Sequence, residues 1–150
     1  MSTLQGLQPI LLVEDSPEDY EAARRAFTKS RIRNPLIRVE NGTEALDFLF
    51  HRGSYSAPES APRPAVVLLD LNLPGINGFD VLKEIKNSND LRQIPVIMLT
   101  TSDAPSDVTR CYAAGANTYI KKPVSLHAFV DAVQRLHQYW FEIALIPCDS

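Results

Sequence analysis

Residues 66–75 read Val-Val-Leu-Leu-Asp-Leu-Asn-Leu-Pro-Gly, and this stretch decides how the rest of the chain is arranged. Residues 65–69 carry no polar side chain, which is typical of a strand buried on both faces of a parallel sheet. Asp70 follows this run directly. In open α/β sheets the ligand crevice lies beyond the carboxyl ends of the strands. We therefore expect Asp70 to be the chemical centre of the protein.

The composition indicates one ordinary globular domain. The chain has 150 residues, 45% of them hydrophobic and 22% charged, which is enough for a full core. The formal net charge of -3 argues against a general nucleic-acid or anionic-membrane binder. No apolar run approaches about 18 residues, so we expect no membrane span. Residues 1–9 do not resemble a secretory signal, and we expect a cytoplasmic protein in which Cys111 and Cys148 are reduced.

Five expected strands alternate with five helix signals. The expected strands are 10–13, 36–40, 65–69, 95–99 and 116–120. The expected helices begin at Ser16-Pro17, Asn41-Gly42, Asn77-Gly78, Pro105 and Ser125. This alternation predicts an α/β fold: a five-stranded parallel sheet with helices on both faces and right-handed crossovers. The first and third strands are the most apolar and should be central, which favours the flavodoxin-like order 2-1-3-4-5.

Two segments depart from this alternation. Residues 53–64 are rich in Ser and Pro, and we expect them to form an exposed, mobile loop without regular structure before the third strand. The second helix should run to about His51, with Gly53 stopping it. Residues 139–150 form an apolar extension after the last helix. The predicted organisation is thus a single domain over 1–150 with one loop insertion and one C-terminal extension.

Polar side chains gather at the carboxyl ends of the predicted strands. They are Glu14 and Asp15 after the first strand, Asp70 after the third, Thr100 after the fourth and Lys122 after the fifth. Parallel strands bring these ends to one edge, where three carboxylates would repel one another without a cation. Mg²⁺ accepts such oxygen ligands, and a lysine suits a phosphate. The set therefore favours an aspartate nucleophile that accepts a phosphoryl group in line.

These residues lie within motifs that resemble the receiver domain of two-component response regulators. The similarity extends over about residues 8–138, and five motifs in the same order are far more specific than any one alone. The matching motifs are 12–16 (Leu-Val-Glu-Asp-Ser), 69–75 with Asn77-Gly78, 95–100, 115–117 leading to Tyr119, and Lys122-Pro123.

The resemblance implies a role for each site residue. Asp70 would accept a phosphoryl group from the phosphohistidine of a histidine kinase. Glu14, Asp15, Asp70 and the backbone carbonyl of Asn72 would hold Mg²⁺. Lys122 would contact the phosphate. On this reading the protein is a phosphoacceptor that assists its own phosphorylation and dephosphorylation, and it is not an enzyme acting on other substrates.

The resemblance also implies a two-state switch. Thr100 would move to hydrogen-bond the phosphate while Tyr119 changes rotamer. Asn72 and Ser102 occupy positions at which the family tunes dephosphorylation. Pro123 would follow a cis peptide bond.

The end of the chain resembles that of the small response regulators paired with cyanobacterial phytochromes. We therefore expect a phytochrome-type histidine kinase as the partner, and a homodimer through the fourth helix, fifth strand, last helix and tail. The tail is too apolar for a solvated segment, and aromatic residues are favoured at interfaces. The expected interface residues of the tail are Tyr139, Trp140, Phe141, Ile143 and Leu145.

Three alternatives fit the sequence less well. An aspartate-based phosphohydrolase typically carries a second acid two residues after its nucleophile, where this chain has Asn72. A flavodoxin needs a phosphate-binding loop after the first strand, where Glu14 and Asp15 would repel phosphate. A pseudo-receiver would keep the fold and act only as an interaction module.

Overall fold

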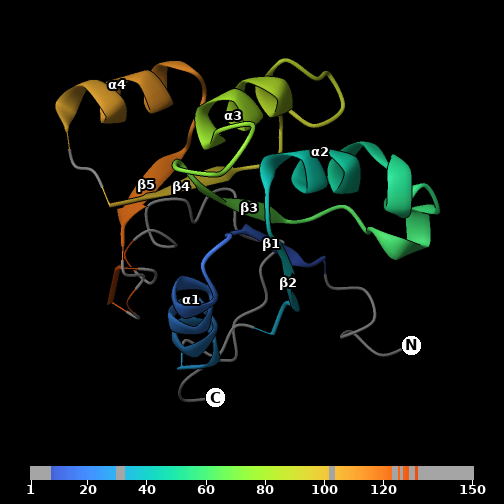
Figure 1. Ribbon diagram of the computed structural model, residues 1–150, viewed down its shortest axis with the longest axis horizontal. Helices are drawn as coiled ribbons and strands as arrows, with labels where there is room; N and C mark the ends of the chain where they lie inside the picture. The colour runs from blue at the N-terminus through green and yellow to red at the C-terminus, as the bar shows by residue number, and fades with distance from the viewer. Residues whose placement is uncertain are drawn as a thin grey trace, which may run out of the picture.

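A computed structural model describes residues 8–29, 33–101, 104–122, 125, 127–128 and 131. Its centre is a five-stranded parallel sheet in the order β2-β1-β3-β4-β5, as the sequence predicted (Figure 1). The strands are β1 (Ile10–Val13), β2 (Leu36–Val39), β3 (Val66–Asp70), β4 (Val96–Thr100) and β5 (Thr118–Lys121). β5 begins two residues later than expected, and Thr100 and Asp70 are the last residues of their own strands.

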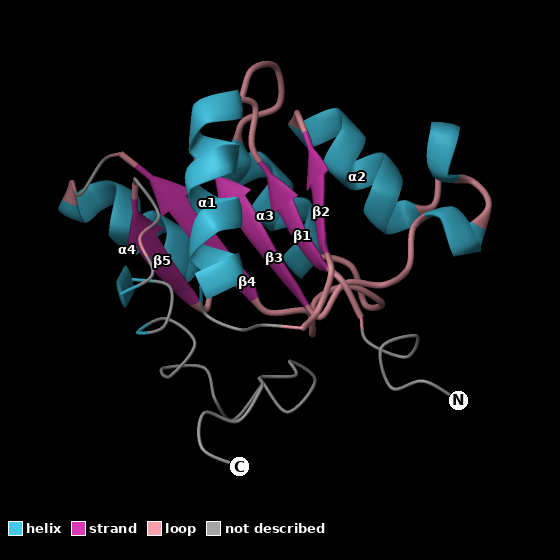
Figure 2. Ribbon diagram, turned by 90° about the horizontal axis from the view of Figure 1, so that it is seen from below, coloured by secondary structure: helices cyan, strands magenta, loops and turns pink. Residues whose placement is uncertain are grey.

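Helices cover both faces of the sheet, which confirms the predicted layers (Figure 2). The four helices are α1 (Pro17–Lys29), α2 (Gly42–Phe50), α3 (Gly78–Lys86) and α4 (Pro105–Ala113). α1 lies on one face, and α2, α3 and α4 lie on the other. The predicted last helix lies mostly outside the described residues.

The core divides into two clusters because successive side chains of a strand point to opposite faces. Leu11 and Val13 of β1 pack with α2 and α3, whereas Ile10 and Leu12 pack with α1. All residues of β3 are buried. The prediction that residues 65–69 are buried on both faces is therefore confirmed, and Asp70 is carried to the sheet edge by a rigid central strand.

Side chains fix the helix starts close to where the sequence placed them. The Oγ of Ser16 accepts a hydrogen bond from the backbone N–H of Asp19 at 3.2 Å. Asn41 and Asn77 accept in the same way, at 2.8 and 2.9 Å, from the residues three positions later. These caps satisfy backbone donors that a helix start leaves unpaired.

The segment 53–64 is more ordered than expected. It contains two 3-10 turns, Gly53–Tyr55 and Pro58–Ser60, so the prediction of no regular structure was wrong. The hydroxyl of Tyr55 donates to Oε2 of Glu44 at 2.7 Å, and its ring lies edge-on to Phe48 with the centroids 5.1 Å apart. One aromatic side chain thus attaches the insertion to α2, a contact that composition does not reveal.

α2 ends at Phe50 with His51 as its C-cap, which confirms the expected end at about His51. His51 adopts the left-handed conformation with φ of 56°, and its N–H donates to the carbonyl of Asp47. Its Nε2 lies 2.8 Å from the carbonyl oxygen of Ala61, so the side chain also contacts the end of the insertion. In the described part of the chain no helix is long and apolar enough to cross a membrane.

Candidate functional site

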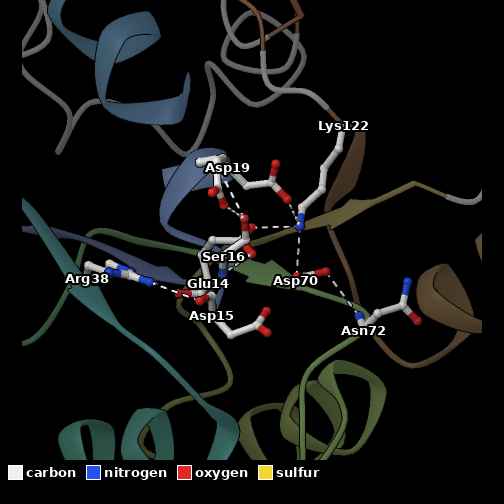
Figure 3. A network of polar contacts seen from close by, with 9 residues as sticks. Glu14, Asp15, Ser16, Asp19, Arg38, Asp70, Asn72 and Lys122 are labelled. Atoms are coloured by element: carbon white, nitrogen blue, oxygen red, sulfur yellow. Dashed lines mark hydrogen bonds and ion pairs between the residues drawn. The ribbon is translucent and has the colours of Figure 1, made fainter. Parts of the chain in front are cut away.

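The predicted site residues converge at the carboxyl edge of the sheet (Figure 3). Glu14 and Asp15 follow β1, and Asp70 ends the neighbouring β3. Thr100 ends β4, and its carbonyl accepts the backbone N–H of Lys122 at 2.8 Å. The parallel register therefore brings four strand ends together, as the sequence predicted.

Lys122 is the centre of the polar network. Its Nζ lies 2.8 Å from each of three carboxylate oxygens: Oε1 of Glu14, Oδ2 of Asp19 and Oδ2 of Asp70. The lysine side chain is only 8% exposed. Burial lowers the pKa of Lys122, but the hydrogen bonds to the three carboxylates outweigh it and raise the pKa above its ordinary value. Lys122 is therefore a fixed positive charge beside Asp70.

Glu14, Asp15 and Asp70 form an acidic cluster. Each can offer one oxygen such that the three atoms lie within 4.8 Å of one another. Glu14 and Asp70 are buried, whereas Asp15 is exposed. Three oxygen donors at this spacing, open to solvent on one side, fit a hard divalent cation that keeps some of its waters.

The electrostatics of Glu14 show how crowded this cluster is. The pKa of Glu14 is raised from 4.5 to about 7, mainly because the carboxylate is buried. The hydrogen bond to Lys122 lowers this pKa, and the negative charge of Asp70 raises it further. Its Oε2 also accepts the backbone N–H of Ser16 at 3.1 Å. The carboxylate is held in place, but its negative charge is not fully neutralised by the surrounding groups. A bound cation would neutralise it further.

Asp70 is oriented by backbone contacts as well as by Lys122. Its Oδ1 accepts the backbone N–H of Asn72 at 3.0 Å, while Oδ2 faces the lysine. Gly78 at the start of α3 packs against the main chain of Asp70, and a Cβ there would lie 2.1 Å from the Asp70 carbonyl oxygen. Only glycine fits this approach, which explains the Asn-Gly pair after β3.

The sequence reasoning missed two residues of this site. Asp19 lies in the first turn of α1, and its carboxylate binds Lys122. Arg38 lies on β2, and its guanidinium donates to the carbonyls of Glu14 and Asp15 at 3.0 and 3.2 Å. Arg38 also lies over the ring of Tyr20, 5.0 Å from the centroid.

The predicted switch residues occupy suitable places. Thr100 is buried at the end of β4. Tyr119 is half-buried on β5, with its ring edge-on to Tyr112 at a centroid distance of 6.2 Å. Their movement stays a prediction. Ser102, Pro123 and the tail residues 139–145 lie outside the described residues.

A flavodoxin-like sheet with an acidic cluster and a buried lysine at its carboxyl edge defines the receiver class of α/β proteins. Residues 10–134 match the response regulator receiver domain, and the chain belongs to this family of two-component signalling proteins. The curated response regulator Rcp1 of Synechocystis sp. (strain ATCC 27184 / PCC 6803 / Kazusa) is 41% identical over 138 residues, 92% of each chain.

Solved structures agree with this assignment. The bacteriophytochrome response regulator RtBRR is 42% identical, with a TM-score of 0.83 over 96% of this chain and 83% of that one. The manganese-bound form of Rcp1 is 40% identical, with a TM-score of 0.74 over 94% of this chain and 99% of that one. The chain is thus a receiver closely related to phytochrome response regulators, and its function is that of a phosphorelay response regulator.

Proposed function

We propose that Asp70 is the residue that accepts the phosphoryl group. The observation that carries this proposal is the position of its carboxylate, buried at the end of β3 with Oδ2 2.8 Å from the Lys122 ammonium. No other aspartate in the described part of the chain joins a strand end, the acidic cluster and this lysine. The alternative of a pseudo-receiver would leave this convergence without a chemical role.

The transfer needs few protein groups. An oxygen of the Asp70 carboxylate attacks the phosphorus of a phosphohistidine, a P–O bond forms, and the P–N bond breaks. The imidazole nitrogen of the donor leaves with the electron pair and takes a proton from water. Lys122 places positive charge where the phosphoryl oxygens gather, which is the main contribution a protein makes to such a reaction. Thr100 would then donate its hydroxyl to the new group.

The residues present fit Mg²⁺ as the cofactor. Glu14, Asp15 and Asp70 supply oxygens at the required spacing, and the Asn72 carbonyl is the expected fourth protein ligand. The related protein Rcp1 has been solved with Mn²⁺, which supports a divalent cation at a site of this type. A bound cation would neutralise charge on the phosphoryl oxygens. Asn72 in place of a second acid continues to disfavour a phosphohydrolase.

A phytochrome-type histidine kinase is the proposed phosphoryl donor, because the relatives are named as phytochrome or bacteriophytochrome response regulators. The protein itself is a phosphoacceptor that assists its own reactions, and we place it in the cytoplasm. We keep the homodimer as part of the proposal: Tyr112 lies on α4, one of the elements expected at the interface, and is 42% exposed. Binding to nucleic acid or a membrane is not part of this function.

Acetyl phosphate with Mg²⁺, followed by intact mass spectrometry, tests the proposal. The full chain should gain one phosphoryl group, and Asp70→Asn should gain none. Asp107→Asn is the matched control, because Asp107 lies on α4 outside the acidic cluster and should keep the adduct. An adduct that persists in Asp70→Asn, or no adduct in the unmodified chain, would contradict the assignment.

A further inference from the structure

Asp19 belongs to the Lys122 network but not to the acidic cluster. Its Oδ2 lies 2.8 Å from the lysine Nζ, as close as the oxygens of Glu14 and Asp70. The cluster that can hold a cation contains only Glu14, Asp15 and Asp70 among the described residues. In Figure 3 Asp19 and Asp70 reach the lysine from different sides. Asp19 is therefore the one partner of Lys122 that a metal would leave unchanged.

Both partners of this ion pair are held by backbone structure. Asp19 is the third residue of α1, and its N–H donates to Oγ of Ser16. α1 is in turn fixed to the sheet by Ala23 and Phe27 in the core. Lys122 donates its own backbone N–H to the Thr100 carbonyl. The contact between Asp19 and Lys122 is thus built into the fold rather than made by two loose surface side chains.

A phosphoryl group on Asp70 would change the balance of charges around Lys122. A cation would engage Glu14 and Asp70, so Asp19 would stay as the carboxylate that pairs with the lysine. The phosphoryl oxygens would then compete with Asp19 for the same ammonium. Asp19 also adds a negative charge close to the incoming group, and like charges at this range repel. Both effects oppose the phosphorylated state.

We propose that Asp19 restrains Lys122 and so weakens the binding of a phosphoryl group at Asp70. Asp19 is a positioning residue in this account, because it acts on the phosphoryl group through the lysine. The inference rests on the proposed role of Asp70 as the phosphoacceptor. On this inference, a side chain of α1 helps to set how readily Asp70 is phosphorylated.

Beryllofluoride, which mimics a phosphoryl group on a carboxylate, provides the test. Its affinity for the full chain is measured by fluorine NMR at saturating Mg²⁺ for the unmodified protein, Asp19→Asn, Asp19→Glu and Glu18→Gln. Glu18 is the matched control: it lies on the same turn and is exposed, and its Oε1 accepts from Ser16 rather than from Lys122. Asp19→Asn and Glu18→Gln each remove one negative charge from the first turn of α1.

Asp19→Asn should bind beryllofluoride roughly two- to fivefold more tightly than the unmodified protein, because a half-exposed ion pair contributes modestly. Glu18→Gln should stay close to the unmodified value, and Asp19→Glu should return towards it. Equal or weaker binding by Asp19→Asn would overturn the inference and leave the role of Asp70 intact. Failure of the unmodified protein to bind beryllofluoride would instead overturn the proposed function.

A second titration separates this effect from damage to the fold. Affinity for Mg²⁺ alone should not rise in Asp19→Asn, because loss of Asp19 leaves Lys122 to compete more strongly for Glu14 and Asp70. A distorted site would weaken both affinities together. Tighter beryllofluoride binding with unchanged or weaker Mg²⁺ binding supports the inference, and a parallel loss of both contradicts it.

Discussion

Lys122 Nζ lies 2.8 Å from Oδ2 of Asp70, although the two residues are 52 positions apart in the sequence. The distance is set by the sheet, because β3 and β5 both flank β4 and end at the same edge. One ammonium here serves three carboxylates. This relationship explains both how the site tolerates its buried acids and how it would receive a phosphoryl group.

Lys122→Met should destabilise the protein in the absence of metal. It leaves Glu14 and Asp70 buried without their cation, and breaking such a pair costs about 3 kcal/mol in the free energy of unfolding. Mg²⁺ should restore part of that loss, which urea unfolding with and without the metal would show. Lys121→Met is the control, because Lys121 is exposed and should change the unfolding free energy little. Equal effects of the two substitutions would contradict the account.

Glu14 should make the metal-free protein less stable as the pH rises. Its folded pKa, about 7, exceeds its unfolded value of 4.5, so the folded state binds more protons between these values. The contribution of Glu14 to the free energy of unfolding is fully present below pH 4.5 and is lost as the pH rises through 7. This loss is at most about 3 kcal/mol. A pH series of urea unfolding should show this slope, and Glu14→Gln should flatten it.

Mg²⁺ affinity should rise over the same pH range, because the cation and the proton compete for Glu14. Calorimetric titration at pH 6 and pH 8 would measure this difference. The Glu14→Gln variant should bind Mg²⁺ more weakly and with less dependence on pH. An affinity for Mg²⁺ that is independent of pH would remove Glu14 from the metal site.

Arg38→Met should weaken metal binding without unfolding the protein. Arg38 holds the carbonyls of Glu14 and Asp15, and groups that orient metal ligands typically contribute about tenfold or more to affinity. Titration with Mg²⁺ would measure the loss. Arg25→Met is the control, because Arg25 is 71% exposed on α1 and pairs with Glu21 of the same helix. An equal loss of Mg²⁺ affinity in Arg38→Met and Arg25→Met would contradict this role, because it would show that only the loss of a positive charge weakens binding.

Gly78→Ala should be strongly destabilising. The added Cβ would meet the Asp70 carbonyl oxygen at 2.1 Å, so the backbone of either β3 or α3 must shift. We expect a loss of about 2–4 kcal/mol in thermal or urea unfolding. Gly75→Asn is the comparison: Gly75 has a φ of 72° with open space around it, and asparagine tolerates that conformation. A mild effect at Gly78 would contradict the described packing.

The sequence was sufficient for the sheet and for the residues that end its strands. Asp70 and Lys122 lie at the ends of predicted strands, and a parallel sheet brings these ends to the same edge. Asp19 and Arg38 were missed because their roles depend on how α1 and β2 are set against β1, which periodicity does not define. The insertion was misjudged for a similar reason: Tyr55 and Glu44 are 11 positions apart, and only the fold brings them together.

The central assignment is that Asp70 carries the phosphoryl group. Phosphorylating the full chain with acetyl phosphate and Mg²⁺, reducing the acyl phosphate with borohydride and sequencing the peptides by mass spectrometry would locate it. The account predicts homoserine at position 70 and unmodified aspartate at positions 15 and 19. Homoserine at another position, with Asp70 intact, would contradict it.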